Sequence, residues 1–504
     1  MHRPGSRSGE GGVIGGGGGA KLNGGKKEPL NGSMANLKVN GTSERQPSPA
    51  SSSSPKRTPL IPPFMVSAPG KVIVFGEHAV VHGKTAMAAS ISLRSYLLVT
   101  TLGKTERTIS LLFPDIGLEH AWIVDDLPWK EFQHPDRKKY YYDLVSSLDE
   151  VLVKATQPHT QDVSKHLPDE QRKVHQNAAL MFLYLFLSLG SEANPGCIYT
   201  LRSTIPVGAG LGSSASIGVC ISAALLLQIR ALAGPHPDQP IDESSLQIER
   251  INRWAFVGEL CIHGNPSGVD NTVASGGRAV IFKRTDYTKP PIVKLMRNFP
   301  ELPLLVVDTR QPRSTSIEVA KVAILKKTQP AITDLVLEAI NKVTEAAIDI
   351  VSSQDFDAND LSSMKTLGDL VTLNHGLLVS LGVSHPKLEK IRELTDAADV
   401  GYTKLTGAGG GGCAITLIKP GFDKVKLKAL DLRLDSEGFK RYETYLGGDG
   451  VGVLFPAILK NDTEEEGGEE IDQEKFLNAE GRDGVEALVG VGLHQRREGW
   501  KFWR

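Results

Sequence analysis

The sequence has few cysteines, few aromatic residues and almost no net charge. Its 504 residues include four cysteines, 6% aromatic residues and 57 basic against 58 acidic side chains, for a formal net charge of -1. Nucleic-acid-binding and membrane-surface proteins usually carry a basic excess, so this balance argues against both classes. The cysteines, Cys197, Cys220, Cys261 and Cys413, are far apart and form no CxxC pair. We therefore expect no structural zinc site and no disulfide framework, and a reducing cytoplasm fits.

Long hydrophobic runs are also lacking. The longest apolar stretches, residues 178–187 and 219–229, fall short of the roughly 20 residues that a membrane-spanning helix needs. A charged segment followed by an apolar one does not open the chain, so no secretory signal is expected. At roughly 100–200 residues per domain, the length predicts two or three domains.

The two ends of the chain differ in composition from its middle. Residues 1–60 contain Gly and Ser runs and no Phe, Trp or Tyr, which is typical of a disordered tail because little apolar surface can be buried. Residues 457–504 begin with an acidic stretch that predicts a solvated tail, although Trp500, Phe502 and Trp503 could dock on something.

The middle of the chain mixes strand and helix patterns without a regular βαβ alternation. This order predicts an α+β fold with two lobes, which we assign to residues 64–297 and 298–456. Strands are expected at residues 72–75, 86–101, 198–203, 279–282, 304–308 and 413–418, and helices at 140–155, 176–188, 215–233, 244–263, 315–326, 329–353, 358–380, 386–399 and 422–437.

The segment Pro206–Ser216 carries the strongest chemical signal. Its sequence PVGAGLGSSAS places three alternate glycines between an expected strand and an expected helix. Glycine allows backbone amides to approach a ligand, and the helix start adds unpaired amides and a positive dipole, so the pattern predicts a phosphate site. The pattern is neither a P-loop nor a dinucleotide fingerprint. Of Ser213 and Ser214, one is expected to cap the helix and the other to bind Mg²⁺, although a simple tight turn stays possible.

Two further segments contain ionisable residues beside apolar strands. Lys71 lies where a turn enters a strand, with Glu77 and His78 at its far end, which predicts either a pocket or solvated charges. Glu259 lies late in an expected helix, and Asp270 follows in an expected loop. One carboxylate could bind a metal ion while the other accepts a proton from the substrate. Alternatively, Glu259 faces solvent and Asp270 caps a turn.

His263 is interpreted as a helix-end residue near the negative pole of the helix dipole rather than as a ligand. A fourth segment, Lys404–Ala414, has five glycines among the six residues 407–412. Glycine at this density costs chain entropy, so a close approach to a phosphate or to the other glycine loop is expected.

These four segments in this order resemble the GHMP kinase superfamily, which includes galactose, homoserine, mevalonate and phosphomevalonate kinases. The segment Ile262–Asn271, IHGNPSGVDN, is most similar to the mevalonate kinase branch, and Asp308–Thr315 resembles the substrate-side turn of the superfamily. The resemblance covers about residues 64–456. It implies an N-terminal lobe like ribosomal protein S5 domain 2, a ferredoxin-like C-terminal lobe, and an active site between them.

The resemblance also implies site residues. Asp270 and Lys71 would be catalytic, and Ser214 and Glu259 would hold Mg²⁺. The substrate would be met by Glu77, His78, Arg313 and Thr315. ATP would contact Lys71, Ser203, Gly208, Ala209, Gly210, Leu211, Gly212, Ser213, Ser214 and Asp115.

The function implied by the resemblance is ATP- and Mg²⁺-dependent phosphorylation of the C5 hydroxyl of mevalonate in isoprenoid and sterol biosynthesis. The alternative is another small-molecule kinase of the superfamily, above all one acting on phosphomevalonate. A catalytically silent metabolite sensor would also keep the fold, and an interaction protein would leave both glycine loops unexplained. The family resemblance further implies a homodimer and feedback inhibition by isoprenoid diphosphates, with no nucleic-acid or membrane partner.

Overall fold

The computed structural model describes residues 62–264, 266–285, 291–459, 469–471, 473–491 and 499–504. The chain divides into two compact units, residues 1–56 and 57–504, and the description below concerns the second. The predicted disordered tail at residues 1–60 lies outside the described residues.

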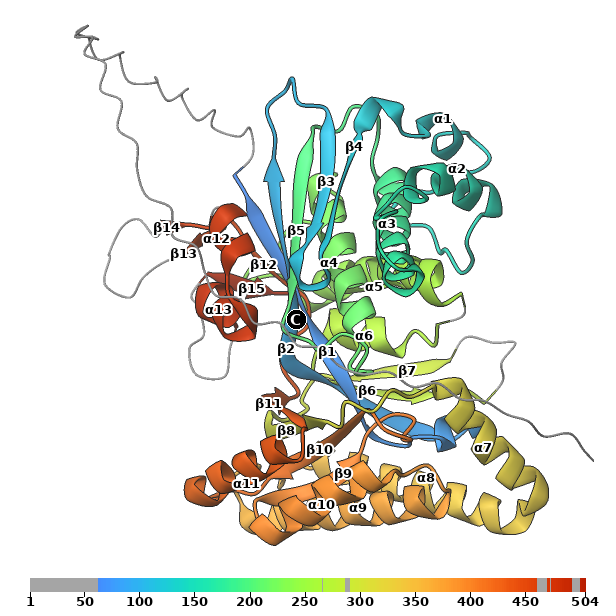
Figure 1. The fold of residues 1–504 in the computed structure, drawn as a ribbon, viewed down its shortest axis with the longest axis vertical. Coiled ribbons are helices and arrows are strands. Elements are labelled where there is room, and N and C mark those ends of the chain that lie inside the picture. The colour runs from blue at the N-terminus through green and yellow to red at the C-terminus, as the bar shows by residue number, and fades with distance from the viewer. Residues whose placement is uncertain (1–61, 265, 286–290, 460–468, 472, 492–498) are drawn as a thin grey trace, which may run out of the picture. The chain divides into compact units, whose positions relative to one another are not determined.

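One 13-stranded sheet runs through the second unit (Figure 1). Its strands are β1 (Phe64–Phe75), β2 (Thr85–Thr101), β3 (Thr108–Phe113), β4 (Leu118–Ile123), β5 (Cys197–Ser203), β6 (Ala279–Lys283), β7 (Ile292–Met296), β8 (Leu302–Asp308), β9 (Gly401–Leu405), β10 (Cys413–Ile418), β11 (Lys440–Leu446), β12 (Gly452–Leu454) and β15 (Trp500–Phe502). The main path is β15-β12-β1-β2-β11-β8-β10-β9. Two branches leave β2: one runs through β5 to β3 and β4, and the other through β6 to β7. Two short strands, β13 (Ile458–Leu459) and β14 (Glu469–Glu470), pair separately.

The long strand β2 joins the two halves of the sheet. Its first part pairs with β6, its second part pairs with β5, and Ile91 in the middle pairs with Leu446 of β11. The 17 residues of β2 are rich in β-branched and apolar side chains and are nearly all buried, as expected for a central strand. The predicted α+β class is confirmed, and both halves share one continuous sheet.

Helices cover the sheet on several sides (Figure 1). In the N-terminal half, α3, α4 and α5 pack together, and α4 is apolar all round because it is enclosed on every side. In the C-terminal half, α8 to α11 pack on and around β8 to β11. The helices are α1 (Trp129–Phe132), α2 (Glu150–Thr160), α3 (Asp169–Leu189), α4 (Ser213–Gln228), α5 (Ile241–His263), α6 (Val269–Gly276), α7 (Thr315–Thr328), α8 (Pro330–Ser352), α9 (Leu361–Ser380), α10 (Pro386–Ala398), α11 (Lys424–Ser436), α12 (Gln473–Asn478) and α13 (Gly481–Val489), with short 3-10 turns at Ala79–His82, Pro114–Ile116 and Val124–Asp126.

Two local expectations are wrong, and several strands were missed, among them β3, β4, β7, β9, β11 and β12. The expected helix 140–155 begins only at Glu150, where Asp149 caps it by accepting hydrogen bonds from two backbone amides. Asp270 lies in the first turn of α6 rather than in a loop. Strands β3 and β4 were not expected, since their alternation is short and their partner β5 lies far along the chain.

The acidic residues 462–468, on which the prediction of a solvated C-terminal tail rested, lie outside the described residues. The described part of the segment is packed on the sheet, which was the alternative left open for Trp500, Phe502 and Trp503. Strand β15 pairs with β12, and Phe476, Val485 and Trp503 are buried. Arg202 of β5 donates hydrogen bonds to the backbone carbonyls of three residues in and just after α12. This segment therefore forms part of the core, and Figure 1 shows α12 and α13 on the side of the sheet away from α3 and α5.

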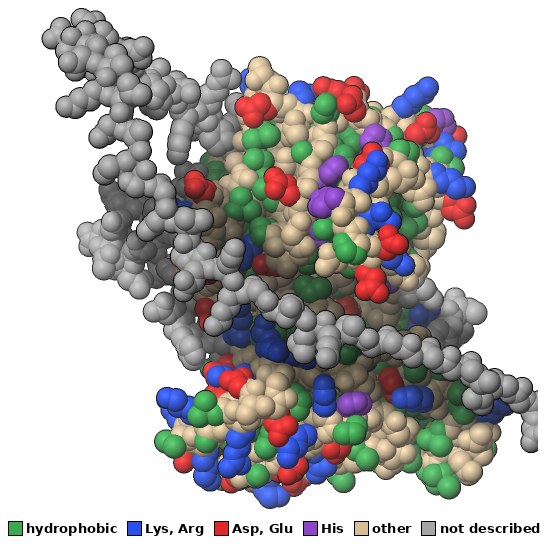
Figure 2. All heavy atoms as spheres, in the orientation of Figure 1, with side chains coloured by type: hydrophobic (Ala, Val, Ile, Leu, Met, Phe, Trp, Pro, Cys, Tyr) green, Lys and Arg blue, Asp and Glu red, His purple; other side chains and the backbone are tan. Residues whose placement is uncertain are grey.

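The surface carries both acidic and basic side chains, as the near-zero net charge leads one to expect. Figure 2 shows acidic and basic side chains interspersed over the face that it presents, without one large patch of a single sign. Among the described residues, every helix is too short or too polar to cross a bilayer. The lobe boundaries given above stay predictions.

Candidate active site

A cavity of about 610 Å³ opens where both glycine-rich loops meet β1 and the end of α5. Its polar walls come from segments far apart in the sequence. They include Lys71 of β1, the loop 206–214, His263, Asp270, Arg313, Thr315 and the loop residues Gly407 and Ala408. The tertiary structure thus brings together most of the residues that the sequence singled out.

The first glycine loop, residues 206–212, joins β5 to α4. Gly208, Gly210 and Gly212 have φ values of 77°, 79° and 76°, a region that favours glycine. Gly212 is the N-cap residue of α4, and no side chain caps this helix. Its first backbone amides and its positive dipole end are therefore presented at the cavity, which is the arrangement that binds phosphates.

Lys71 links this loop to the beginning of α6. Its Nζ atom lies 3.3 Å from Oδ1 of Asp270 and donates a hydrogen bond of 3.4 Å to the carbonyl of Gly210. The Lys71 side chain is 10% exposed, whereas that of Asp270 is 35% exposed and reaches the cavity. Asp270 thus lies between the Lys71 ammonium group and the amino end of α6, two sources of positive charge.

Glu259 lies deeper, in the last turns of α5, and is 4% exposed. Burial, and secondly the nearby Asp270 carboxylate, raise the pKa of Glu259 to about 7. A hydrogen bond from Ser214 and the charge of Lys71 oppose this rise in pKa. The alternative that Glu259 faces solvent is therefore wrong.

The pair of Ser214 and Glu259 fits a divalent cation. Oε1 of Glu259 is buried without a hydrogen-bond partner, which is costly unless a further group satisfies it. A carboxylate and a hydroxyl beside a phosphate-binding loop are oxygen ligands of the kind that Mg²⁺ prefers.

His263 is a cavity residue that the sequence analysis set aside. Its Nε2 atom lies 3.3 Å from Oγ of Ser214 and 3.8 Å from Oε2 of Glu259. The signal was present in the sequence, because Glu259 and His263 are four residues apart and share one face of α5.

The opposite end of the cavity is apolar. It is lined by side chains from β3, α3, β5 and α4, with Asn177 as a polar group among them. Such a lining suits a flat, mostly apolar group that is oriented by a few polar contacts. The sequence analysis missed this end because its residues belong to ordinary core patterns. They include Leu111, Phe113, Met181, Leu201 and Ile217.

The second glycine loop, residues 406–412, meets the first through Arg313. The guanidinium donates hydrogen bonds to the carbonyls of Thr406, at 3.2 Å, and Ala209, at 3.5 Å. Burial lowers the pKa of Arg313. Arg313 and Thr315 both line the cavity at the start of α7, as expected of residues near a substrate.

Glu77 and His78 are not among the residues that line the cavity, and their predicted contact with the substrate stays a prediction. Glu77 is fully buried, forms an ion pair with the buried Lys404 and accepts a hydrogen bond of 3.0 Å from Asn374. Nε2 of His78 lies 2.9 Å from the carbonyl of Ala408, and burial lowers the pKa of His78. Both residues fix β1 against the second glycine loop and its neighbours.

Three expected nucleotide contacts also lie off the cavity. Ala209 is a buried residue within the first loop. Asp115 forms an ion pair with Arg202 at 2.9 Å, and it accepts a hydrogen bond of 2.6 Å from the Ser203 amide. None of the three belongs to the lining. Their predicted contact with a nucleotide stays a prediction.

Two family models match parts of this chain. The GHMP kinases N terminal domain matches residues 176–277, and the GHMP kinases C terminal model matches residues 356–429. The first match includes the first glycine loop, Glu259 and Asp270, and the second includes the second glycine loop.

Curated relatives match most of the chain. It is 65% identical over 468 residues to the mevalonate kinase erg12 of Aspergillus fumigatus, covering 92% of this chain and 86% of that protein. It is 64% identical over 450 residues to the mevalonate kinase of Gibberella zeae, covering 89% of each chain. Its identity to the human mevalonate kinase is 37% over 402 residues, with 77% and 94% covered.

Solved structures agree in fold. The Methanococcus jannaschii mevalonate kinase matches with a TM-score of 0.54 at 22% identity, covering 78% of this chain and 100% of that one. The L. major mevalonate kinase in complex with R-mevalonate matches with a TM-score of 0.53 at 23% identity, covering 78% and 99%.

Proposed function

The chain belongs to the mevalonate kinase family of the GHMP kinases, and from that premise we propose that the cavity between its glycine loops transfers the terminal phosphoryl group of ATP to the C5 hydroxyl of (R)-mevalonate. The chain is an enzyme that phosphorylates mevalonate. Phosphomevalonate as the alternative substrate is not favoured, because the relatives at 65% and 64% identity are both mevalonate kinases.

The contact between Lys71 and Asp270 beside the first glycine loop carries this proposal. Phosphoryl transfer requires mainly that the reactants are positioned and that charge on the phosphate oxygens is neutralised. The backbone amides at the start of α4 and the Lys71 ammonium supply positive charge where phosphates would lie. The apolar end of the cavity suits the adenine ring.

Asp270 acts on the attacking hydroxyl. A primary alcohol is a poor nucleophile at neutral pH, so its proton must leave as the new P–O bond forms. The Asp270 carboxylate accepts that proton, and the Lys71 ammonium group, at 3.3 Å, holds the carboxylate in place beside the first glycine loop. The bond between the terminal phosphorus and the bridging oxygen then breaks, and ADP leaves.

Three residues hold the partners of this reaction. Ser214 and Glu259 are the ligands we assign to Mg²⁺, which when bound neutralises phosphate charge. Arg313 lines the cavity between the glycine loops and is the cationic partner that suits the mevalonate carboxylate. Dimer formation, inhibition by isoprenoid diphosphates and a cytoplasmic location stay predictions from the family resemblance.

The experiment is an ADP-release assay on mevalonate, phosphomevalonate, galactose and homoserine, for the parent and for Asp270→Asn. We expect turnover with mevalonate, and a loss of about 10²–10⁴ in kcat for Asp270→Asn with ATP binding retained. Asp435→Asn, on the exposed face of α11, is the matched control and keeps normal turnover. Near-normal turnover of Asp270→Asn would refute its role, and absence of ATP turnover in the parent would favour a silent sensor.

A further inference from the structure

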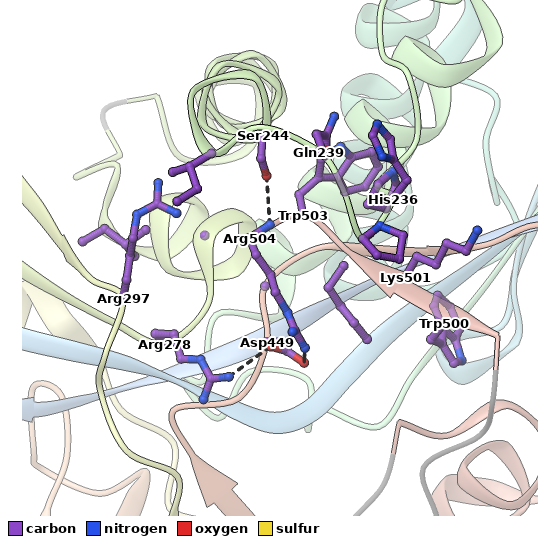
Figure 3. Close-up of a pocket in the computed structure, with 17 residues that line it drawn as sticks. His236, Gln239, Ser244, Arg278, Arg297, Asp449, Trp500, Lys501, Trp503 and Arg504 are labelled. Atoms are coloured by element: carbon purple, nitrogen blue, oxygen red, sulfur yellow. Dashed lines mark hydrogen bonds and ion pairs between the residues drawn. The ribbon is translucent and has the colours of Figure 1, made fainter.

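A second cavity, of about 660 Å³, lies apart from the active site and shares no lining residue with it among the described parts of the chain (Figure 3). It is formed by the first turn of α5, the end of α6, residues around β7 and the C-terminal strand β15. The proposed reaction uses none of these residues, and the C-terminal segment was expected to be solvated.

The lining of this cavity has a surplus of positive charge. Arg278, Arg297, Lys501 and Arg504 line it, and within the described chain Asp449 is the acidic residue among the lining residues. Figure 3 shows Arg278 and Arg504 both directed toward Asp449, with Arg297 on the same side of the cavity. His236 lines the cavity as well and would add charge when protonated.

Within the described residues, the ion pairs at this cavity leave Arg297 and Lys501 without a carboxylate partner. Asp449 is shared by Arg278, at 3.2 Å, and Arg504, at 3.6 Å, while Arg278 also meets the half-exposed Glu301. Arg297 donates instead to the neutral hydroxyl of Ser245 at 2.7 Å. Several guanidinium groups on one side of a concave site are suited to a phosphate group, whose oxygens accept paired hydrogen bonds.

The floor of the cavity is held firmly. The buried Arg94 donates hydrogen bonds to the carbonyls of Asp449, at 2.8 Å, and Gly450, at 2.5 Å. The backbone amide of Arg504 donates to Oγ of Ser244 at 2.9 Å, which ties the chain after β15 to the first turn of α5. The backbone that carries Asp449 and Arg504 is therefore held by hydrogen bonds.

The remaining wall is aromatic. Trp500 and Phe502 stack with ring centroids 6.3 Å apart, and Arg94 lies over the Phe502 ring. Trp503 is buried and donates from Nε1 to Gln247 at 2.9 Å. Aromatic side chains beside cationic groups suit a ligand with an apolar or aromatic body and a charged end.

We propose that this cavity, lined by Arg278, Arg297, Lys501 and Trp500, binds a ligand that has a phosphate group at one end and an apolar or aromatic body at the other, and that its occupation changes the rate of the kinase reaction. The expected effect on the kinase rate follows from two helices that contribute residues to both cavities. Gly276 at the end of α6 and Ser244 in α5 line this cavity, whereas Asp270 of α6 and His263 of α5 line the active site. Both helices therefore run from one site to the other.

Binding is tested by calorimetry with phenyl phosphate, with inorganic phosphate and phenol for comparison. We compare the parent chain with the double variant Arg297→Gln/Lys501→Gln. The matched control is Lys294→Gln/Lys424→Gln, which removes the same charge from exposed positions outside the lining. Phenyl phosphate can also enter the active site. Binding at the second cavity is therefore identified as the calorimetric signal that is present in the parent and the control but absent in the double variant.

We expect phenyl phosphate to bind the parent and the control at this extra site, and the double variant to bind at least about tenfold more weakly, since charge-assisted hydrogen bonds are lost. Identical binding isotherms for the parent and the double variant would overturn the proposal. Equal affinity for inorganic phosphate and phenyl phosphate would overturn the apolar part of the ligand. Unchanged kinase activity of the double variant without phenyl phosphate shows that it is folded.

The effect of the second cavity on the kinase reaction is measured separately, as the initial rate of phosphorylation. With ATP and mevalonate saturating, phenyl phosphate should change the initial rate of the parent and the control, and this component should be missing in the double variant. A rate that responds identically in all three proteins, while calorimetry shows the extra site only in the parent and the control, would overturn the link through α5 and α6.

Discussion

The two glycine-rich loops look alike in sequence but are glycine-rich for different physical reasons. A Cβ atom added to Gly208 in the first loop would meet no atom within 4 Å, so its surroundings are open. In the second loop, a Cβ atom on Gly409 would lie 2.0 Å from the carbonyl oxygen of Val383, and one on Gly410 would lie 2.3 Å from Oε1 of Glu318. A Cβ atom on Gly210 or Gly212 would meet side-chain atoms of Arg313, at 2.0 Å, or of Lys71, at 3.0 Å. The first loop is therefore open at Gly208 and bordered elsewhere by side chains, whereas the second loop also approaches protein backbone at Gly409.

The second loop is anchored to β1 and to the residues that follow it. Thr406 donates a hydrogen bond of 2.8 Å to the carbonyl of Ile73 in β1, and Lys404 just before it pairs with Glu77. Dense glycine is therefore no proof of a phosphate site, because tight packing of backbone makes the same demand. The following experiments test this difference between the loops.

The largest effect is expected at the buried pair that anchors the second loop. Glu77→Gln leaves the Lys404 ammonium buried without a carboxylate, and burial already lowers the pKa of Lys404. We expect a loss of about 3–5 kcal/mol in the free energy of unfolding, measured by urea denaturation.

The double variant Glu77→Gln/Lys404→Met is the control for this pair. It removes both charges and keeps an acceptor for Asn374, so we expect it to regain most of the lost stability. A single variant within about 1 kcal/mol of the parent would contradict the anchoring role of the pair.

Gly409→Ala should disturb packing in the second loop. Alanine at φ 74° costs about 1–2 kcal/mol, and the forced contact with the Val383 carbonyl adds about 1–3 kcal/mol. Gly421→Ala has a similar φ of 68° but open surroundings, so it isolates the backbone cost. If both variants lost the same stability, the second loop would not be closely packed.

The pH dependence of stability should have opposite signs at the two loops. The pKa of Glu259, beside the first loop, is raised to about 7, so the folded state binds the proton more tightly and stability falls as pH rises from about 4.5 to 7. The effect is at most about 3 kcal/mol. The pKa of His78, against the second loop, is lowered by burial, so stability falls as pH drops below 6.5.

Urea denaturation between pH 5 and 8, with a chelator present, separates the two groups. Glu259→Gln should remove the loss at rising pH, and His78→Asn should remove the loss at falling pH, with asparagine tolerating the φ of 58° at this position. Parallel pH profiles for the parent and Glu259→Gln would show that Glu259 is not protonated in the folded state.

The smallest effect on stability is expected at Gly208, where the effect on ligand binding should dominate. Gly208→Ala and Gly438→Ala share a φ of 77° and open surroundings, so both should lose about 1–2 kcal/mol. Only Gly208→Ala should also raise the KM for ATP, by about tenfold for a loss of about 1.4 kcal/mol in binding. Equal KM values for the two variants would mean that the first loop does not hold the nucleotide.

Motif spacing predicted much of the site. Three alternate glycines before a helix, a lysine entering a strand and two carboxylates eleven residues apart marked the segments that carry the site, and the family resemblance implied that these segments meet. The spacing did not reveal that Asp270 begins a helix, because the Gly-Pro-rich approach to it reads as a loop. It also did not reveal the partner of the buried Glu77 carboxylate, because Lys404 lies 327 residues away along the chain.

The sequence by itself determined the α+β class, the bounds of most helices and the identity of the first glycine loop, because these depend on local backbone preferences and on periodic burial. Only the tertiary structure decided which ionisable groups are partners, that the second glycine loop is packed rather than open, and that the C-terminal segment closes a second cavity. Charge pairing and close packing depend on distances between remote segments, and the order of residues along the chain does not contain those distances.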